Sequence, residues 1–376
     1  MGLTLGQVVR RFGDPYLHKY ADGILPSHRQ ALRAIARCRT EALGGQVYRC
    51  PHCGTLDYKY HSCRNRHCPQ CQHLQTHAWL DHQARLLLPT RYFLLTFTLP
   101  AGLRALAQAN QKLVYNLLFR VTANAAQSLA RDPRYVGGQL GMIGILHTWS
   151  RTLAYHPHIH YLVPAGGLGK DGVWHPARWS NFLFPVKALS KLVRGKFRQA
   201  LRKTGLACKV PVKVWRQNWV VHCKPAGDGH SVLKYLAPYV FHVAISNRRL
   251  LALDDHGDMA SSRIAFSYRT SDTGENKSMT LSVEAFLQRF LQHILPKGFV
   301  KVRYYGCFAP GCRSRLKAIR QQLTPNLPVS CSSHGDTQDQ IPLETLPLCP
   351  TCGQPMRLWL TLPRQSPLPL TGRAPP

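Results

Sequence analysis

Runs of apolar residues bounded by Gly or Pro predict buried strands in the middle of the chain. Residues 91–99 are mostly apolar, interrupted by Thr96 and Thr98, and are followed by Pro100. Residues 141–149 and 158–163 are also mostly apolar. Short runs of this kind are typical of strands that pack against other elements. Two further strands are expected within residues 210–223. The centre of the chain is therefore predicted to form a sheet.

Helices are expected between and around these strands. Residues 101–131 predict one long helix or two, and Ser27 with Gln30 forms a capping box that would begin a helix near residue 27. Pro185, at a position where proline is tolerated, would open an amphipathic helix. This order of elements predicts an α+β fold, with helices flanking an antiparallel sheet.

The charge of the chain changes the picture most. Its 376 residues, enough for two or three domains, include 49 Lys and Arg against 17 Asp and Glu, a formal net charge of +32. Such an excess indicates a polyanionic partner, DNA or RNA, before a membrane surface. No apolar run approaches the roughly 18 residues that span a bilayer, and the N-terminus lacks a signal pattern. A cytoplasmic, nucleoid-associated protein is expected.

Two predicted helices carry this positive charge on one face. The basic residues of the helix that begins near residue 27 are Arg29, Arg33 and Arg37. Those of the second are Lys187, Lys191, Arg194, Arg198 and Arg202, with no acid from residue 185 to residue 205. A charged stripe is commonly only a solvated face, but the lack of compensating acid favours contact with phosphates. We therefore expect both helices to bind DNA.

The N-terminal cysteines predict a zinc-ribbon-like module. Two C-x2-C pairs stand fourteen residues apart, and their thiolates could close a tetrahedron around structural Zn²⁺. The predicted ligands are Cys50, Cys53, Cys68 and Cys71. Whether Cys38, Cys63, His61 or His67 takes part, as a substitute ligand or in a second partial site, stays open at this point. Thirteen cysteines in a cytosolic chain indicate metal ligands and free thiols, not disulfides.

A third C-x2-C pair, Cys349 and Cys352, lies near the C-terminus. Cys307 and Cys312, or Cys331 with His334, could complete a second zinc site, although neither set has clean spacing. The sequence leaves a second zinc ion and an inert cysteine pair as equal alternatives.

A histidine pair and a tyrosine pair suggest the chemistry. His158 and His160 alternate along a predicted strand, so both project from one face as half of a divalent-metal site. Tyr235 and Tyr239 are four residues apart and share a helical face, and Pro238 between them predicts a kink or a helix start. A tyrosine held near such a metal could attack a phosphodiester.

These motifs resemble a known family. The segments that carry the resemblance are residues 30–73, 147–149, 156–167, 182–187, 235–249 and 293–306. The chain is similar over nearly its whole length to rolling-circle insertion-sequence transposases of the HUH (His-hydrophobic-His) class, whose N-terminal part is a transposase zinc-binding domain. The resemblance implies an HUH-type antiparallel sheet and a tyrosine that forms a 5′-phosphotyrosine link.

The resemblance also implies Mg²⁺ or Mn²⁺ on His158 and His160, with a third ligand among His147, His222 and His242. Tyr239 is slightly favoured over Tyr235 as the residue that attacks first. The expected organisation is a zinc-binding DNA-recognition domain over 1–85 and a catalytic domain over 86–260. A β/α extension with a disordered proline-rich tail would fill 261–376.

The expected function is a transposase that nicks and rejoins single-stranded DNA at insertion-sequence ends. Two alternatives remain: a zinc-dependent DNA-binding protein without catalysis, and a rolling-circle replication initiator or relaxase with the same histidine and tyrosine chemistry. DNA, in the form of single-stranded transposon ends, is the expected partner, no membrane is involved, and the oligomeric state is left open.

Overall fold

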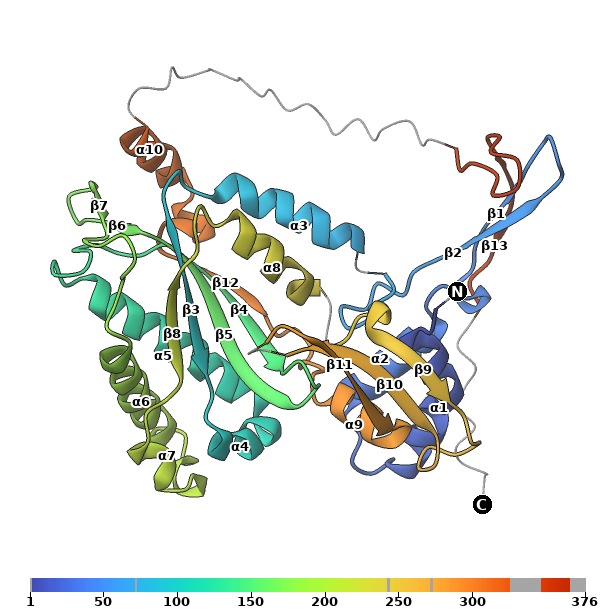
Figure 1. Ribbon diagram of the computed structural model, residues 1–376, viewed down its shortest axis with the longest axis horizontal. Coiled ribbons are helices and arrows are strands. Elements are labelled where there is room, and N and C mark those ends of the chain that lie inside the picture. The colour runs from blue at the N-terminus through green and yellow to red at the C-terminus, as the bar shows by residue number, and fades with distance from the viewer. Residues whose placement is uncertain (1, 72, 242–243, 271–272, 325–345, 366–376) are drawn as a thin grey trace.

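The computed structural model describes residues 2–71, 73–241, 244–270, 273–324 and 346–365. It is a mixed α+β fold with antiparallel sheets flanked by helices, as the sequence predicted (Figure 1). None of the helices in these ranges is long and apolar enough to cross a membrane. Cys331, His334 and most of the proline-rich tail lie outside the described residues.

The central sheet has five antiparallel strands. In spatial order they are β12 (Val302–Tyr305), β4 (Met142–Trp149), β5 (Tyr155–Pro164), β3 (Tyr92–Thr98) and β8 (Val221–Pro225). The strands expected at 91–99, 141–149 and 158–163 are confirmed as β3, β4 and β5. The expectation of two strands within 210–223 is wrong for the first, because Lys213–Arg216 forms the short helix α7. There Val214 is buried, and its carbonyl accepts a hydrogen bond from the Trp219 indole.

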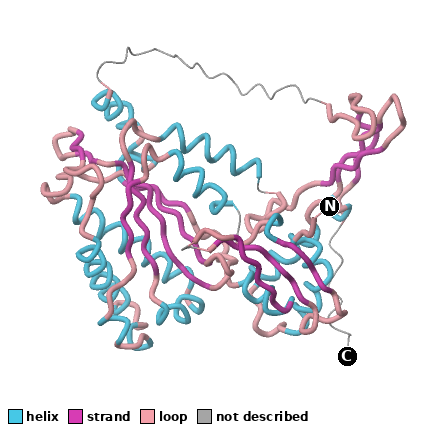
Figure 2. Tube along the Cα trace, in the orientation of Figure 1, coloured by secondary structure: helices cyan, strands magenta, loops and turns pink. Residues whose placement is uncertain are grey.

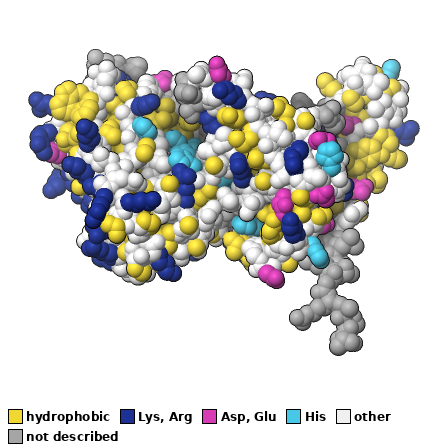
Figure 3. All heavy atoms as spheres, turned by 60° about the horizontal axis from the view of Figure 1, so that its bottom comes forward, with side chains coloured by type: hydrophobic (Ala, Val, Ile, Leu, Met, Phe, Trp, Pro, Cys, Tyr) yellow, Lys and Arg dark blue, Asp and Glu magenta, His cyan; other side chains and the backbone are white. Residues whose placement is uncertain are grey.

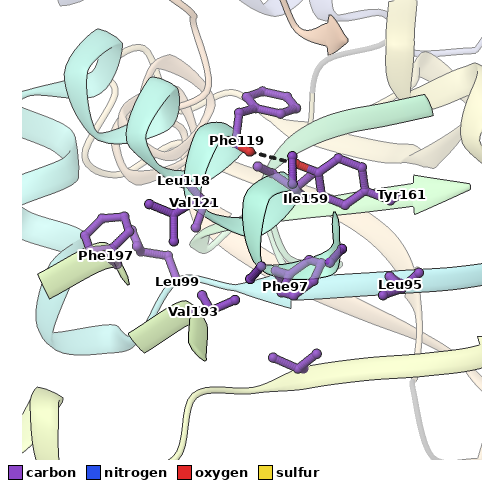
Figure 4. Close-up of a cluster of buried hydrophobic side chains, with 14 of the residues drawn as sticks. Leu95, Phe97, Leu99, Leu118, Phe119, Val121, Ile159, Tyr161, Val193 and Phe197 are labelled. Atoms are coloured by element: carbon purple, nitrogen blue, oxygen red, sulfur yellow. Dashed lines mark hydrogen bonds between the residues drawn. The ribbon is translucent and has the colours of Figure 1, made fainter. Parts of the chain in front are cut away.

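Helices cover both faces of this sheet (Figures 1 and 2). One face packs against α4 (Arg104–Ala109), α5 (Gln111–Ala130) and α6 (Val186–Arg202); the other packs against α3 (His73–Leu86) and α8 (His230–Phe241). The expected helical region 101–131 is thus two helices, separated at Asn110. Figure 4 shows the core on the first face, where Phe97, Phe119 and Tyr161 come from a strand, a helix and a second strand.

A second buried cluster lies beside the central sheet. It joins α1 (Leu5–Lys19) and α2 (Pro26–Arg37) to the sheet of β9 (Leu250–Asp254), β10 (Arg263–Arg269) and β11 (Asn276–Ser282), and to α9 (Val283–Leu291). Apolar side chains from segments assigned by sequence to different domains share this core.

Helix α2 begins at a different residue from the one predicted. The capping box expected at Ser27 is wrong, because α2 begins at Pro26 and its N-cap residue Leu25 makes no side-chain cap. Proline suits the first helical position, where its missing N–H has no partner to lose, so it moves the helix start ahead of the serine.

A three-stranded arm projects from this region in Figure 2. Its strands are β1 (Gly45–Arg49), β2 (Leu56–Tyr60) and β13 (Arg357–Leu362), with β1 in the centre and antiparallel to both neighbours. The arm therefore combines two strands from the N-terminal part of the chain, β1 and β2, with one from the C-terminal part, β13. Tyr58, Leu358 and Trp359 are exposed large apolar side chains on it.

Gly144 of β4 provides a test of the core packing. A Cβ there would lie 2.5 Å from Cε1 of Tyr161, whose hydroxyl is hydrogen-bonded to Thr122 and to the Phe119 carbonyl. The ring cannot withdraw, so Gly144→Ala should lower the free energy of unfolding by about 1–3 kcal/mol.

Gly195→Ala is the matched control, because Gly195 is exposed on α6 and no atom lies within 4 Å of the position that an added methyl group would take. It should raise stability by about 0.5–1 kcal/mol. Urea unfolding of the two variants and the wild type measures both effects. Equal midpoints for Gly144→Ala and wild type would contradict the packing described here.

Candidate functional site

Three histidines meet on one face of the central sheet. The β4–β5 register sets His147 directly opposite His158 and places His160 opposite Ile145, one step along the same face. The three rings offer ligand atoms that all lie within 4.8 Å of one another. His147 and His160 are buried, whereas His158 is half-buried, so the group opens towards solvent at His158.

Neighbouring groups fix the orientation of two of these rings. Thr96 of β3 places its hydroxyl oxygen 2.8 Å from Nδ1 of His160. Nδ1 of His158 donates to the carbonyl oxygen of His156, 2.6 Å away. In both rings Nε2 is therefore left to face a shared centre, which is how ligand histidines are usually held around a metal.

The protonation of the histidines suits metal binding. Burial lowers the pKa of His158 to about 4 and that of His160 to about 3. Burial also holds the pKa of His147 well below its usual value. All three imidazoles are thus neutral at neutral pH, with a lone pair for a cation. Three imidazole nitrogens suit a divalent transition metal, and a hard cation such as Mg²⁺ or Mn²⁺ would need oxygen ligands from water or phosphate beside them.

Among the three residues considered as third ligand, the structure brings His147 to the pair. His222 lies on the same face, opposite Thr96, but β3 separates it from His160, which puts the two about 10 Å apart. His242 lies outside the described residues. Sequence alternation alone does not find His147, because its proximity arises from the pairing of β4 with β5.

Tyr235 lies beside the histidine group, in contact with His160. It projects from α8, is 46% exposed, and its ring meets that of His160 edge to face with centroids 6.4 Å apart. α8 begins at His230 and runs through Pro238, so the alternative of a helix start at the proline is wrong. Tyr239 lies one turn further along α8, and its side chain is outside the described residues.

Four of the N-terminal cysteines form a cluster at the end of α2. Its members are Cys38, Cys63, Cys68 and Cys71, whose sulfur atoms lie within 4.8 Å of one another. The sulfurs of Cys63 and Cys71 are 3.7 Å apart, and the Asn65 backbone N–H points at the sulfur of Cys63. Four convergent thiols of this kind are typical of a structural zinc site.

The single four-cysteine site predicted from Cys50, Cys53, Cys68 and Cys71 is not assembled in the structure. Of these four cysteines, two belong to the cluster at α2, namely Cys68 and Cys71. The other two, Cys50 and Cys53, lie with Cys349 and Cys352. Spacing favoured pairing the two nearest C-x2-C motifs, whereas the helix end at Cys38 and the pairing of β1 with β13 bring other partners closer. Cys307 and Cys312 belong to neither cluster.

The histidines flanking the cysteines are not part of the cluster either. Nε2 of His67 accepts a hydrogen bond from the Leu295 backbone N–H, which ties the cysteine loop to the chain before β12. Arg66 reinforces the tie by donating to the carbonyls of Pro296 and Phe299. Arg66 is therefore a structural residue here.

The two basic faces differ in exposure. On α6, Lys187, Lys191, Arg198 and Arg202 are exposed, while Arg194 is half-buried and donates to the Gln217 carbonyl. Lys and Arg side chains gather on the α6 side of the molecule in Figure 3. On α2, Arg29, Arg33 and Arg37 are all half-buried, and Arg37 donates to the carbonyls of Ala42 and Gln365. The α6 face is thus the more accessible to DNA.

Comparison with known proteins decides the family. A family model described as "Transposase zinc-binding domain" matches residues 8–99, and one described as "Putative transposase" matches residues 141–316. A Sinorhizobium fredii protein named "Putative transposase y4qJ" is 35% identical over 379 residues, which cover 94% of each chain. This chain belongs to the IS91 transposase family.

A second relative supports the assignment. The "Transposase for insertion sequence element IS801" of Pseudomonas savastanoi pv. phaseolicola is 32% identical over 300 residues, covering 74% of this chain and 70% of the relative. No solved structure matches the chain. As a transposase the protein cleaves and transfers strands of DNA, and the zinc-binding match covers every member of the cysteine cluster at α2.

Thr96 offers a test of the histidine group as a cation site. Thr96→Val keeps the shape of the side chain but removes the hydroxyl that orients His160. Loss of such a partner should weaken Mn²⁺ binding by about 10- to 100-fold, measured by calorimetric titration. Thr98→Val on the same strand is the control, because in the described chain the Thr98 hydroxyl bonds none of the three histidines. Equal Mn²⁺ affinities for both variants would refute the orienting role.

Proposed function

We propose that this transposase nicks and rejoins single-stranded DNA at the ends of its insertion sequence by a tyrosine-dependent, rolling-circle mechanism. The observation that supports this most directly is the position of Tyr235 beside the three-histidine group. Binding of DNA alone requires neither a buried set of convergent imidazoles nor a hydroxyl above it. The combination is typical of a site for metal-assisted phosphodiester chemistry.

The proposed step is a displacement at phosphorus. The tyrosine oxygen attacks the scissile phosphate, an O–P bond forms, and the bond from phosphorus to the 3′-oxygen breaks. The phenolic proton is lost to solvent, and the leaving 3′-oxygen takes one up, so the products are a 5′-phosphotyrosine and a free 3′-hydroxyl. Attack by a later 3′-hydroxyl on the phosphotyrosine reverses the step and rejoins a strand.

The histidines would hold the assisting cation. His147, His158 and His160 supply three neutral nitrogen ligands on one side and leave the half-buried side of His158 open to a phosphate. A bound Mg²⁺ or Mn²⁺ would offset negative charge on the phosphate and lower the pKa of a nearby hydroxyl. Thr96 and the His156 carbonyl would keep two of the rings directed at that position.

Tyr235 is proposed as the residue that attacks first. The sequence slightly favoured Tyr239, whose side chain lies outside the described residues, whereas the contact of the Tyr235 ring with His160 supports a place for Tyr235 at the site. Tyr239, one helical turn away, is kept as the second tyrosine that a cycle of alternating nicking and joining would use.

The exposed Lys and Arg side chains of α6 are proposed to hold the DNA strand. Arg198 and Arg202 are separated by one helical turn and present two charges to the same surface. Near the start of α6, Trp179 and Phe182 are exposed, and the Arg178 guanidinium lies over the Trp179 ring. Cations and exposed aromatic rings together suit a single strand, which offers both phosphates and unpaired nucleobases.

The tyrosine assignment is tested with single-stranded oligonucleotides that carry the element's ends. Wild-type protein with Mn²⁺ should give a covalent protein–DNA band on a denaturing gel, and EDTA should abolish it. Tyr235→Phe should eliminate the band while DNA affinity stays within about twofold, because only the attacking oxygen is lost.

Tyr239→Phe is the matched control, since it makes the same change one turn along the helix. A band that persists in Tyr235→Phe and disappears in Tyr239→Phe would reverse the assignment. Tight DNA binding without a band in any protein, on correct ends, would favour the alternative of a non-catalytic zinc-dependent DNA-binding protein.

The DNA surface is tested by salt dependence. Arg198→Gln with Arg202→Gln removes two charges from α6, so the slope of log affinity for single-stranded DNA against log salt should fall by about 1.4. Arg315→Gln with Lys317→Gln removes two exposed charges from α10 (Ser314–Leu323) and serves as the control. Equal slopes for both double variants would argue against α6 as the DNA track.

A further inference from the structure

The two cysteine pairs outside the cluster at α2 are built as turns of the same form. In the first, Cys50 and Cys53 are followed by Gly54, whose φ of +74° is in the left-handed region that favours glycine. The Gly54 N–H donates to the Cys50 carbonyl at 3.0 Å, and the Cys50 N–H donates to the Thr55 carbonyl at 2.9 Å.

The second turn repeats every one of these features. Cys349 and Cys352 are followed by Gly353, whose φ is +72°. The Gly353 N–H donates to the Cys349 carbonyl at 2.9 Å, and the Cys349 N–H donates to the Gln354 carbonyl at 2.8 Å. In sequence the turns are Cys-Pro-His-Cys-Gly and Cys-Pro-Thr-Cys-Gly. Each is a knuckle that presents two sulfurs from one tight turn, the form typical of zinc ligands.

The two knuckles face each other with metal-site spacing. The sulfurs of Cys50 and Cys352 are 3.5 Å apart, those of Cys53 and Cys349 are 3.6 Å apart, and all four lie within 4.8 Å of one another. Zn–S bonds of about 2.3 Å in a tetrahedron set the sulfurs roughly 3.8 Å apart. A disulfide needs about 2.05 Å, so the spacing fits a shared ion and not two covalent bridges.

The surrounding structure supplies a reason for a metal here. Cys50 and Cys349 are buried with Met356 in a cluster that stands apart from the larger cores. The three-stranded arm has little apolar core of its own, and several of its large side chains, including Leu358 and Trp359, are exposed. Small units that cannot bury enough apolar surface are commonly held by a metal.

We propose that these two knuckles bind a second zinc ion, which fastens the C-terminal strand β13 onto β1 of the N-terminal arm. All four cysteines of the cluster at α2 lie within residues 8–99, whereas this site takes two of its cysteines, Cys349 and Cys352, from outside that range. It joins cysteines that are 296 residues apart in the chain, Cys53 and Cys349. The metal thereby makes the C-terminal segment part of the N-terminal module and would offset the entropy of closing so long a loop.

Zinc content of the full-length protein tests the proposal. Purified wild-type chain, after removal of loosely bound metal, should contain two zinc ions by elemental mass spectrometry. The double variant Cys349→Ser with Cys352→Ser should contain one, because the cluster at α2 is untouched. Cys208→Ser with Cys223→Ser is the matched control and should keep two, since neither of these cysteines belongs to a cluster.

Two further measurements guard against misfolding as the explanation. Cys352→His preserves a zinc-binding donor and should retain both ions. Cobalt substitution of the wild type should give the visible absorption of tetrahedral thiolate sites at two equivalents, and at only one in the Cys349→Ser with Cys352→Ser variant.

One zinc ion in the wild type, or two in the Cys349→Ser with Cys352→Ser variant, would overturn the proposal. DNA cleavage enters none of these measurements, so they stand or fall independently of the tyrosine mechanism.

Discussion

Antiparallel pairing of β4, β5 and β3 is the constraint on which the candidate site depends. The register places His147 opposite His158 and Thr96 opposite His160, so one sheet face carries both the ligand nitrogens and the hydroxyl that orients one of them. A shift by one residue would turn these side chains into the apolar core. The opposite face is filled by α5 and α6, and that packing holds the register in place.

Helix α8 and the cysteine-bearing loops complete the arrangement around this sheet. α8 packs with α3 over the histidine face and carries Tyr235 to the ring of His160. Arg66 and His67 connect the cysteine loop to the segment before β12, the strand next to β4. The zinc-binding module of this IS91-family transposase is thus hydrogen-bonded to the segment that leads into the sheet bearing the proposed catalytic group.

The basic residues of α6 and α2 have different surroundings. The basic residues of α6 lie on the side of the sheet away from the histidines. A DNA strand held there would reach the proposed site only by passing an edge of the sheet. Single-stranded DNA is flexible enough for such a path, whereas a stiff duplex is poorly suited to it. The half-buried arginines of α2 have a different surrounding: Arg33 and Arg37 line a cavity of about 780 Å³ between α1, α2 and the chain after Cys38.

The sequence by itself determined the fold class, the three central strands, the basic helix α6 and the pairing of His158 with His160, because each follows from local periodicity. The tertiary structure decided the rest. His147 joins the other histidines through strand pairing, and Cys38 joins Cys63, Cys68 and Cys71 because α2 ends at it. Cys50 meets Cys352 through a strand from the far end of the chain. Spacing in sequence cannot reveal partners that are brought together only by long-range pairing, and this is why the predicted zinc ligands were divided between two clusters.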